Sequence, residues 1–198
     1  MVLLYVPPVQ NLLRREVTAY ASKATGMQIQ VERIDLRFPL NLLVRGVEVI
    51  QQPDTLLSLE SLNVRVQAWP LVKGKVEVDE VTLSQVAFNS ANLIEGMKIK
   101  GVLGRFFLQS HGVDLSNELA VINQTELSDT HVQMLMNDTT TTPKDTTASA
   151  PVNWKVDLHK LKLKNVSFSM QLPADSMRMA AHIGDCLLYT SDAADDTP

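Results

Sequence analysis

Two adjacent polar residues interrupt the alternation of apolar and polar residues at several places in the chain. Val31 to Leu36, Leu59 to Leu62 and onward to Val66, Val78 to Leu83, and Leu158 to Leu163 share the order apolar, polar, polar, apolar, polar, apolar. Alternation with period two predicts β-strands with one apolar face. An unmatched extra residue would turn every later side chain to the other face. A β-bulge would absorb that residue within one bent strand, and the alternative is a tight turn that divides each stretch into two short strands.

Repetition of this device along the chain predicts the fold class. Bulges that recur from strand to strand curl a sheet. We therefore expect a mainly β protein, in which an N-terminal amphipathic helix precedes a curved, repetitive antiparallel β-sheet with the shape of a groove or taco. Residues 27–88 predict about five short strands, with breaks at Pro53-Asp54 and between Trp69 and Gly74.

The N-terminal part predicts a helix. Apolar residues recur at spacings of three and four between Val9 and Ala24, after a Pro7-Pro8 pair that suits a helix start. Gly26 stands where a left-handed C-cap is expected. We expect an amphipathic helix over residues 8–26 that caps the sheet. Residues 1–7 are too short to span a membrane and are interpreted as the end of a truncated membrane anchor.

The rest of the chain divides by composition. Residues 27–136 form the predicted curved β region, in which the glycine-rich stretch Gly96 to Phe107 is expected to be a flexible strand edge or a loop near lipid. Residues 137–151 are polar and repetitive, and they predict a disordered loop. Residues 152–185 continue the strand pattern. Residues 186–198 begin "CLLYTSDAAD", which resembles a translated adapter sequence from transposon-based sequencing libraries, so we leave them out of the fold prediction.

Charge and residue chemistry exclude several classes of function. The 198-residue chain has a net charge of −4 and no basic cluster, which argues against binding to nucleic acid. Its single cysteine, Cys186, permits neither an intrachain disulfide nor a cysteine-based metal site. The four histidines are far apart in sequence, no phosphate-binding glycine loop is present, and the acidic cluster of Glu77, Asp79 and Glu80 is expected to be solvated. The sequence thus predicts no enzyme, no metal site and no cofactor.

Three stretches together resemble a known family. They are "MQIQVERIDLRFPLNLLVRGVEV", "LLSLESLNVRVQAWPLVKGKVEVDEVTLSQVAF" and "WKVDLHKLKLKNVSFSM", preceded by the apolar segment and the helix. The most specific part is Trp69-Pro-Leu-Val-Lys-Gly-Lys75 followed by Val78-x-x-Val-x-Leu83. The chain resembles the N-terminal region of the AsmA/TamB family, and within it the TamB-like translocation and assembly module subunits. The likeness covers residues 1 to about 172 and excludes most of the anchor and the C-terminal domain.

The resemblance implies a location and partners. Members are anchored in the inner membrane by one N-terminal helix and cross the periplasm of a Gram-negative cell envelope as a taco-shaped β-structure with an apolar interior. The implied role is outer-membrane biogenesis, by carrying phospholipid between membranes, by supporting assembly of outer-membrane proteins, or by both. Implied partners are phospholipid acyl chains, the inner membrane and an outer-membrane barrel assembly partner. No nucleic acid is implied.

The alternation supplies candidates for the groove lining. A one-faced sheet must cover its apolar face with another layer, curl over it, or bind something apolar. The predicted lipid-lining residues are Ile29, Val31, Ile34, Leu36, Phe38, Val47, Val49, Leu59, Leu62, Val64, Val66, Val76, Val78, Val81, Leu83, Val86 and Phe88. An ordinary dry core is the alternative for any one of them. Two other functions stay open: a scaffold that pairs with barrel strands through its sheet edge, and a β-rich surface or adhesin-type structural protein.

Overall fold

The structure is a computed structural model that describes residues 7–72, 77–114, 118–136, 155–172 and 177–189. Its elements are α1 (Pro7–Thr25), β1 (Gln28–Arg37), β2 (Asn41–Gln51), β3 (Asp54–Val66), α2 (Ala68–Val72), β4 (Val78–Asn89), β5 (Met97–Asp114), β6 (Leu119–Met136), β7 (Lys155–Leu158), β8 (Lys160–Leu172) and β9 (Met177–Tyr189). The predicted helix is confirmed to within a residue at each end. The predictions for residues 1–6, for the loop 137–151 and for residues 190–198 concern residues outside those that the structure describes.

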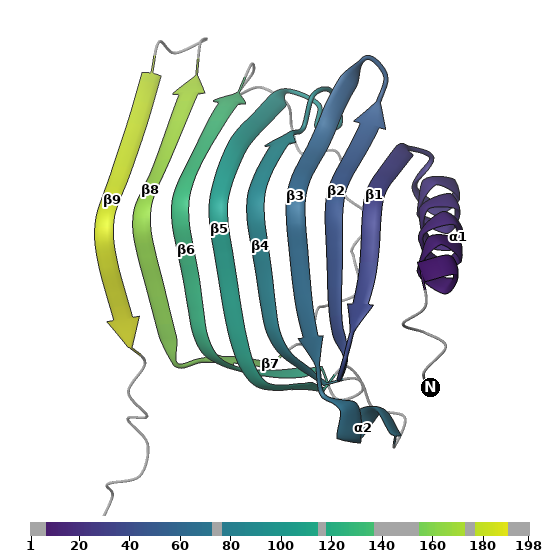
Figure 1. The fold of residues 1–198 in the computed structure, drawn as a ribbon. Coiled ribbons are helices and arrows are strands. Elements are labelled where there is room, and N and C mark those ends of the chain that lie inside the picture. Colours follow the sequence, from purple (N-terminus) through teal and green to yellow (C-terminus); the bar gives the residue numbers. More distant parts are fainter. Residues whose placement is uncertain (1–6, 73–76, 115–117, 137–154, 173–176, 190–198) are drawn as a thin grey trace, which may run out of the picture.

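All strands belong to one open, curved sheet (Figure 1). Its order is β1-β2-β3-β4-β5-β6-β8-β9, with the short β7 also paired to β6. The pairs are antiparallel except those of β6 with β7 and with β8, which are parallel. The mainly β, curved sheet is therefore confirmed, but the sheet is mixed. β6 and β8 run in the same direction, so the chain must return to the other end of the sheet between them.

One residue of each long strand drops out of the pairing, and all of these residues lie at the same level of the sheet. They are Glu32, Gly46, Glu60, Gln85, Gly104, Asp129, Asn165 and Gly184, and we call this line of residues the crease. On the two sides of the crease the register is unbroken: Val31 pairs with Val47, and Arg33 pairs with Arg45. Each skip in the sequence is thus matched by a skip in the neighbouring strand.

The crease is neither the β-bulge nor the tight turn that the sequence suggested for the extra residue. A bulge sets two residues against one and shifts the register, whereas register shifts occur here only elsewhere, as at Val49/Ile50 and Arg65/Val66. A tight turn is also excluded, because the strands continue through the crease and bend there (Figure 1). Four long strands consequently replace the five short ones predicted for residues 27–88.

The crease has an unusual backbone on four of the eight long strands, of which β6 and β8 are neighbours in the sheet. Gly46, Gln85, Asp129 and Asn165, on β2, β4, β6 and β8, have φ angles of 59°, 50°, 51° and 52°. Glycine adopts this left-handed region without steric penalty, and asparagine and aspartate enter it more readily than other residues. The Asn165 Nδ2 atom also donates a hydrogen bond of 2.7 Å to Asp129 Oδ1, which ties β8 to β6 at the crease.

The helix α1 lies along the outer edge of β1 (Figure 1). Ser22 Oγ accepts a 3.1 Å hydrogen bond from the backbone N–H of Ile29, and Arg14 Nη1 donates one of 2.8 Å to the carbonyl oxygen of Glu32. Side chains of α1 therefore satisfy backbone groups that an edge strand would otherwise present to solvent. Tyr20 is 78% exposed, so it belongs to the solvent side of α1. Among the described residues, no helix is both long and apolar enough to cross a membrane.

Replacing Gly46 with alanine tests the crease. A Cβ atom at Gly46 would lie 2.7 Å from the Cβ of Glu32, and the φ of 59° disfavours any L side chain. We expect Gly46→Ala to lower the free energy of unfolding by at least about 1 kcal/mol in urea denaturation. Gly184→Ala is the matched control, because a Cβ atom there meets nothing within 4 Å, and its effect should stay within about 0.5 kcal/mol. Equal losses of stability in the two variants would contradict the left-handed backbone and the close packing against Glu32 at Gly46.

Candidate functional site

Four rows of mostly apolar side chains cross the whole sheet on one face. The register places Ile29, Val49, Leu57, Phe88, Gly101, Val132, Phe168 and Ala181 in the first row; Val31, Val47, Leu59, Val86, Leu103, Thr130, Val166 and Ile183 in the second; Ile34, Val44, Leu62, Leu83, Phe106, Leu127, Leu163 and Cys186 in the third; and Leu36, Leu42, Val64, Val81, Leu108, Thr125, Leu161 and Leu188 in the fourth. We call this surface the apolar face. The crease separates the second row from the third.

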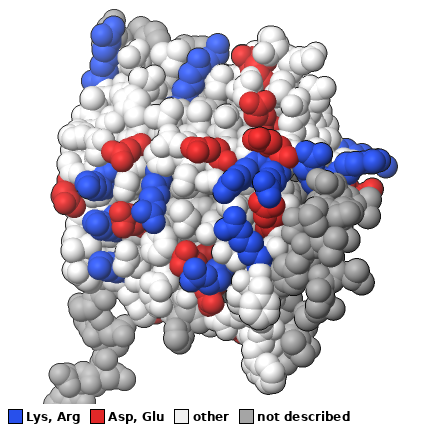
Figure 2. Space-filling view, in the orientation of Figure 1, with Lys and Arg blue, Asp and Glu red and all other residues white. Residues whose placement is uncertain are grey.

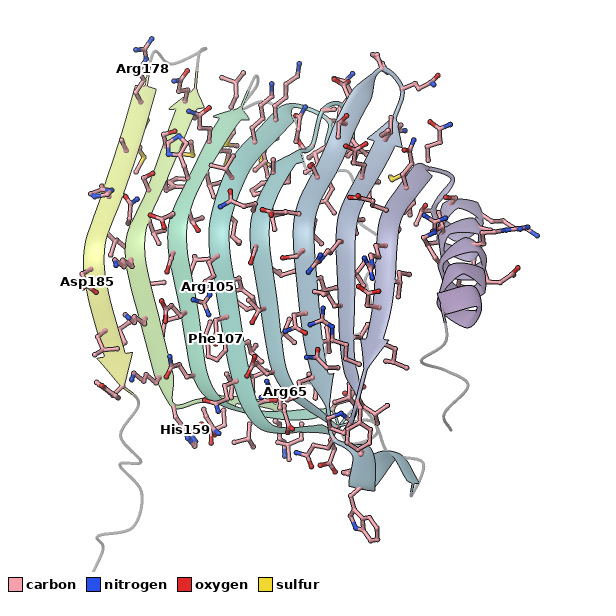
Figure 3. The ribbon with its side chains drawn as sticks, in the orientation of Figure 1. Arg65, Arg105, Phe107, His159, Arg178 and Asp185 are labelled. Atoms are coloured by element: carbon pink, nitrogen blue, oxygen red, sulfur yellow. The ribbon has the colours of Figure 1, made fainter. Side chains whose placement is uncertain are left out.

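The other face is polar. Figure 2 shows it toward the viewer, with Lys, Arg, Asp and Glu side chains spread over the strands, and Arg65 and Arg105 mark it in Figure 3. Charges there are partly paired: Arg33 Nε lies 2.7 Å from Asp35 Oδ1, and Arg65 Nη1 lies 3.3 Å from Glu80 Oε2. The pair of Arg65 and Glu80 is partly exposed and contributes little to stability, whereas the Asp35 carboxylate is buried beside an exposed Arg33. The polar face therefore meets solvent, and the apolar face is the surface that requires a partner or a cover.

No described helix or strand forms a second layer over the apolar face, because α1 packs at the β1 edge. The exposed fraction of its side chains rises from the β1 side of the sheet to the β9 side. Ile34 and Leu59 are 6% and 7% exposed, whereas Phe168 is 36% and Leu188 is 54% exposed. Among the described residues this surface therefore has no second layer, and apolar surfaces of this extent are typical of interaction sites.

Glycine shapes part of the apolar face. A Cβ atom at Gly101 would lie 2.7 Å from Cε1 of Phe88 and 2.9 Å from the carbonyl oxygen of His131, so only glycine leaves room for the Phe88 ring. The ring of Phe88 consequently lies over the backbone of β5 and fills the first row at that strand. This close approach explains a glycine in the middle of a strand, where it otherwise weakens the structure.

The structure brings nearly all the predicted lining residues together. Those on β1 to β4 lie in the four rows, and Val66 pairs with Val78 just beyond the fourth. Phe38 is a correction: it lies in the turn after β1, with its side chain 84% exposed. The strand ends before it because Pro39, the next residue, has no N–H to donate to a neighbouring strand. Val76 lies outside the described residues.

The predicted lining list stops at β4, so the part of the apolar face on β5, β6, β8 and β9 was not in it, although the sequence indicates Leu127, Val132 and Met134 of β6 as inward positions and the register confirms them. The stretch Gly96 to Phe107 was expected at a strand edge or in a loop, but it belongs to β5, an 18-residue strand inside the sheet. The signal was present, since Leu103-x-x-Phe106-x-Leu108 repeats the skip pattern. Glycines on both sides obscured it. Residues 186–189, left out of the prediction with the tail, continue β9, because their alternation fits the open edge of β8.

Polar chemistry on the described residues is sparse. His131 and His182 both pair with Ser167 across the sheet, and His131 Nδ1 lies 2.6 Å from Ser167 Oγ. The other ring nitrogen of His131 lies 2.9 Å from the amide nitrogen of Gln133, and no carboxylate orients the ring as in a nucleophilic triad. Within the described ranges, no group of three His, Cys, Asp or Glu residues could hold a metal ion.

Comparisons with known proteins add no identification. No family model, no curated protein and no solved structure matches the chain.

The uncovered apolar face should bind a hydrophobic fluorescent dye in the folded state. We expect Leu103→Asp, which places a carboxylate on the apolar face, to lower dye fluorescence several-fold. Val102→Asp is the control, because Val102 is the adjacent residue, points to the polar face and is 51% exposed. Thermal unfolding of both variants checks that each remains folded. Similar losses of dye binding in the two folded variants would show that the dye does not report the apolar face.

Proposed function

We propose that the chain is the N-terminal region of an AsmA/TamB-type protein, and that its apolar face lines a groove for phospholipid acyl chains. The protein would be anchored in the inner membrane, extend into the periplasm and serve outer-membrane biogenesis. The observation that carries the proposal is the apolar face itself, whose rows continue from β1 to β9 without a covering layer in the described residues.

The shape of the apolar face suits a long flexible hydrocarbon. Each row crosses eight strands, and adjacent strands lie about 4.8 Å apart, so a row extends for about 34 Å. Burial of hydrocarbon needs no directional partner, only apolar surface that leaves water. An acyl chain laid along a row would gain this burial at every strand that it crosses. A folded protein domain would need a shaped counterpart instead.

The crease supports the same reading. The bend lies between the second and third rows, so the four rows are divided into two pairs on either side of it. Because every strand bends at the same level, the bend forms one continuous line from β1 to β9, along which an acyl chain could lie without interruption.

Site-specific photocrosslinking tests the proposal. A photoreactive amino acid at Val64 or Val81, which pair across β3 and β4 on the apolar face, should crosslink to phospholipid when the protein is made in Gram-negative cells. The same amino acid at Asn63 or Thr82 is the control, because these two residues also pair with each other but point to the polar face. Mass spectrometry identifies the adducts. Absence of lipid at Val64 and Val81, or equal labelling at all four positions, would overturn the proposed groove.

Strand addition is the second candidate function, and the β9 edge favours it. Among the described residues, β9 pairs only with β8 and leaves its outer backbone groups without a neighbouring strand. Such an edge can pair with an extended segment of another protein. The two functions use different groups, since lipid uses the apolar face and strand addition uses the backbone. Leu103→Asp should therefore abolish lipid crosslinking but spare any strand pairing at β9.

A further inference from the structure

One end of the sheet is rich in methionine on its apolar face. There β5 and β9 begin and β6 and β8 end (Figure 1), and we call this the methionine end. It holds six of the eight methionines of the chain: Met97, Met134, Met136, Met170, Met177 and Met179. The register sets Met134 beside Met170 and Met170 beside Met179. Methionine is flexible and polarisable, so it adapts to apolar ligands of varied shape.

The opposite face of the same end carries basic side chains. Lys98 and Lys100 on β5 face away from the methionines, and Arg178, the second residue of β9, lies at the level of Lys98 with β6 and β8 between them. A hollow of about 360 Å³ lies beside the two lysines on β5, β6 and β8, and its lining also includes Gln133, Met134, Leu135, Ser169 and Gln171. Ammonium, amide and hydroxyl groups are hydrogen-bond donors, and together they suit the oxygens of a phosphate.

These cations have no acidic partner in the part of the chain that the structure describes. Lys98, Lys100 and Arg178 form no ion pair, and neither does Glu95, the acid closest in sequence to Lys98. Lower on the same face, by contrast, Lys162 Nζ lies 3.8 Å from Glu126 Oε2. Figure 3 places Arg178 at the upper end of β9. The charge at this end is therefore available to an anion.

The two observations meet at the rim of a single-layered sheet, where only the backbone separates Met97 from Lys98 and Met177 from Arg178. We propose that the methionine end binds an anionic phospholipid, with the headgroup phosphate at Lys98, Lys100 and Arg178 and an acyl chain on the methionines. This inference rests on the proposed lipid groove and adds a headgroup preference to it. A free phosphate ion would engage the cations but would leave the methionines without a ligand.

Binding of two fluorescent lipids tests the headgroup preference. Phosphatidylglycerol and phosphatidylcholine with identical labelled acyl chains are titrated with the full chain. The wild type should bind the anionic lipid more tightly, by about tenfold for one to two effective cation contacts. The variant Lys98→Gln/Lys100→Gln/Arg178→Gln should lose this preference and lose less affinity for phosphatidylcholine, because the choline cation of that lipid offsets the charge of its phosphate.

A matched triple variant controls for net charge. Arg45→Gln/Lys155→Gln/Lys164→Gln removes the same charge from exposed residues away from the methionine end, and none of the three forms an ion pair among the described residues. The preference for the anionic lipid should survive in this control. If both triple variants lose it equally, or if the wild type binds the two lipids equally, the inference is overturned while the groove stands.

The variant Met134→Asp tests binding of the acyl chain independently of binding of the headgroup. Met134 lies between Ile99 and Met170 on the apolar face, so a carboxylate there should weaken both lipids by about tenfold or more and leave their ratio unchanged. Unchanged affinity in this variant would overturn the placement of the acyl chain. Failure of the wild type to bind either lipid would instead overturn the proposed function from which this inference starts.

Discussion

The structure depends on one constraint, the extra residue that every long strand carries at the same level. In an isolated strand such a residue turns all later side chains to the opposite face. Here each strand pairs with another that has its own extra residue, so the register is restored on the far side of the crease. The apolar side chains therefore stay on one face over the whole strand length, and the sheet bends where the pairing is interrupted.

The crease and the apolar face are two consequences of the same alternation. Because the step of three occurs in register, the second and third rows meet across the bend on all eight strands. The backbone strain falls on β2, β4, β6 and β8, at Gly46, Gln85, Asp129 and Asn165. Gly46 and the pair Asp129 and Asn165 are residues that tolerate it, whereas Gln85 has no such advantage. In the part of the chain that the structure describes, no helix packs as a second layer on the nine-stranded sheet, so its bend follows from local backbone conformation at the crease.

The two edges of the sheet differ in their hydrogen bonding, and its two ends differ in their residue types. At β1, two side chains of α1 satisfy the outer backbone, and at β9 the described residues leave it unpaired. Of the two ends of the sheet, the end where β5 and β9 begin holds six methionines on the apolar face, with Lys98, Lys100 and Arg178 on the opposite face. The sheet therefore runs from β1, whose edge is covered by α1, to β9, whose edge is open. At the methionine end, basic residues would bind the lipid headgroup and methionines would bind the acyl chain.

The sequence by itself determined the class of fold, the helix and most of the lining residues, because period-two alternation and its skips depend only on neighbours in the chain. It also held the skip pattern of β5, in Leu103, Phe106 and Leu108, although glycines concealed it. Only the tertiary structure decided that the skips lie level with one another, that β6 and β8 are parallel, and that α1 covers an edge and leaves the apolar face open. Register, strand order and the placement of Lys98 and Arg178 at one level of the sheet join residues far apart in sequence, and a local pattern contains no information on which strands become neighbours.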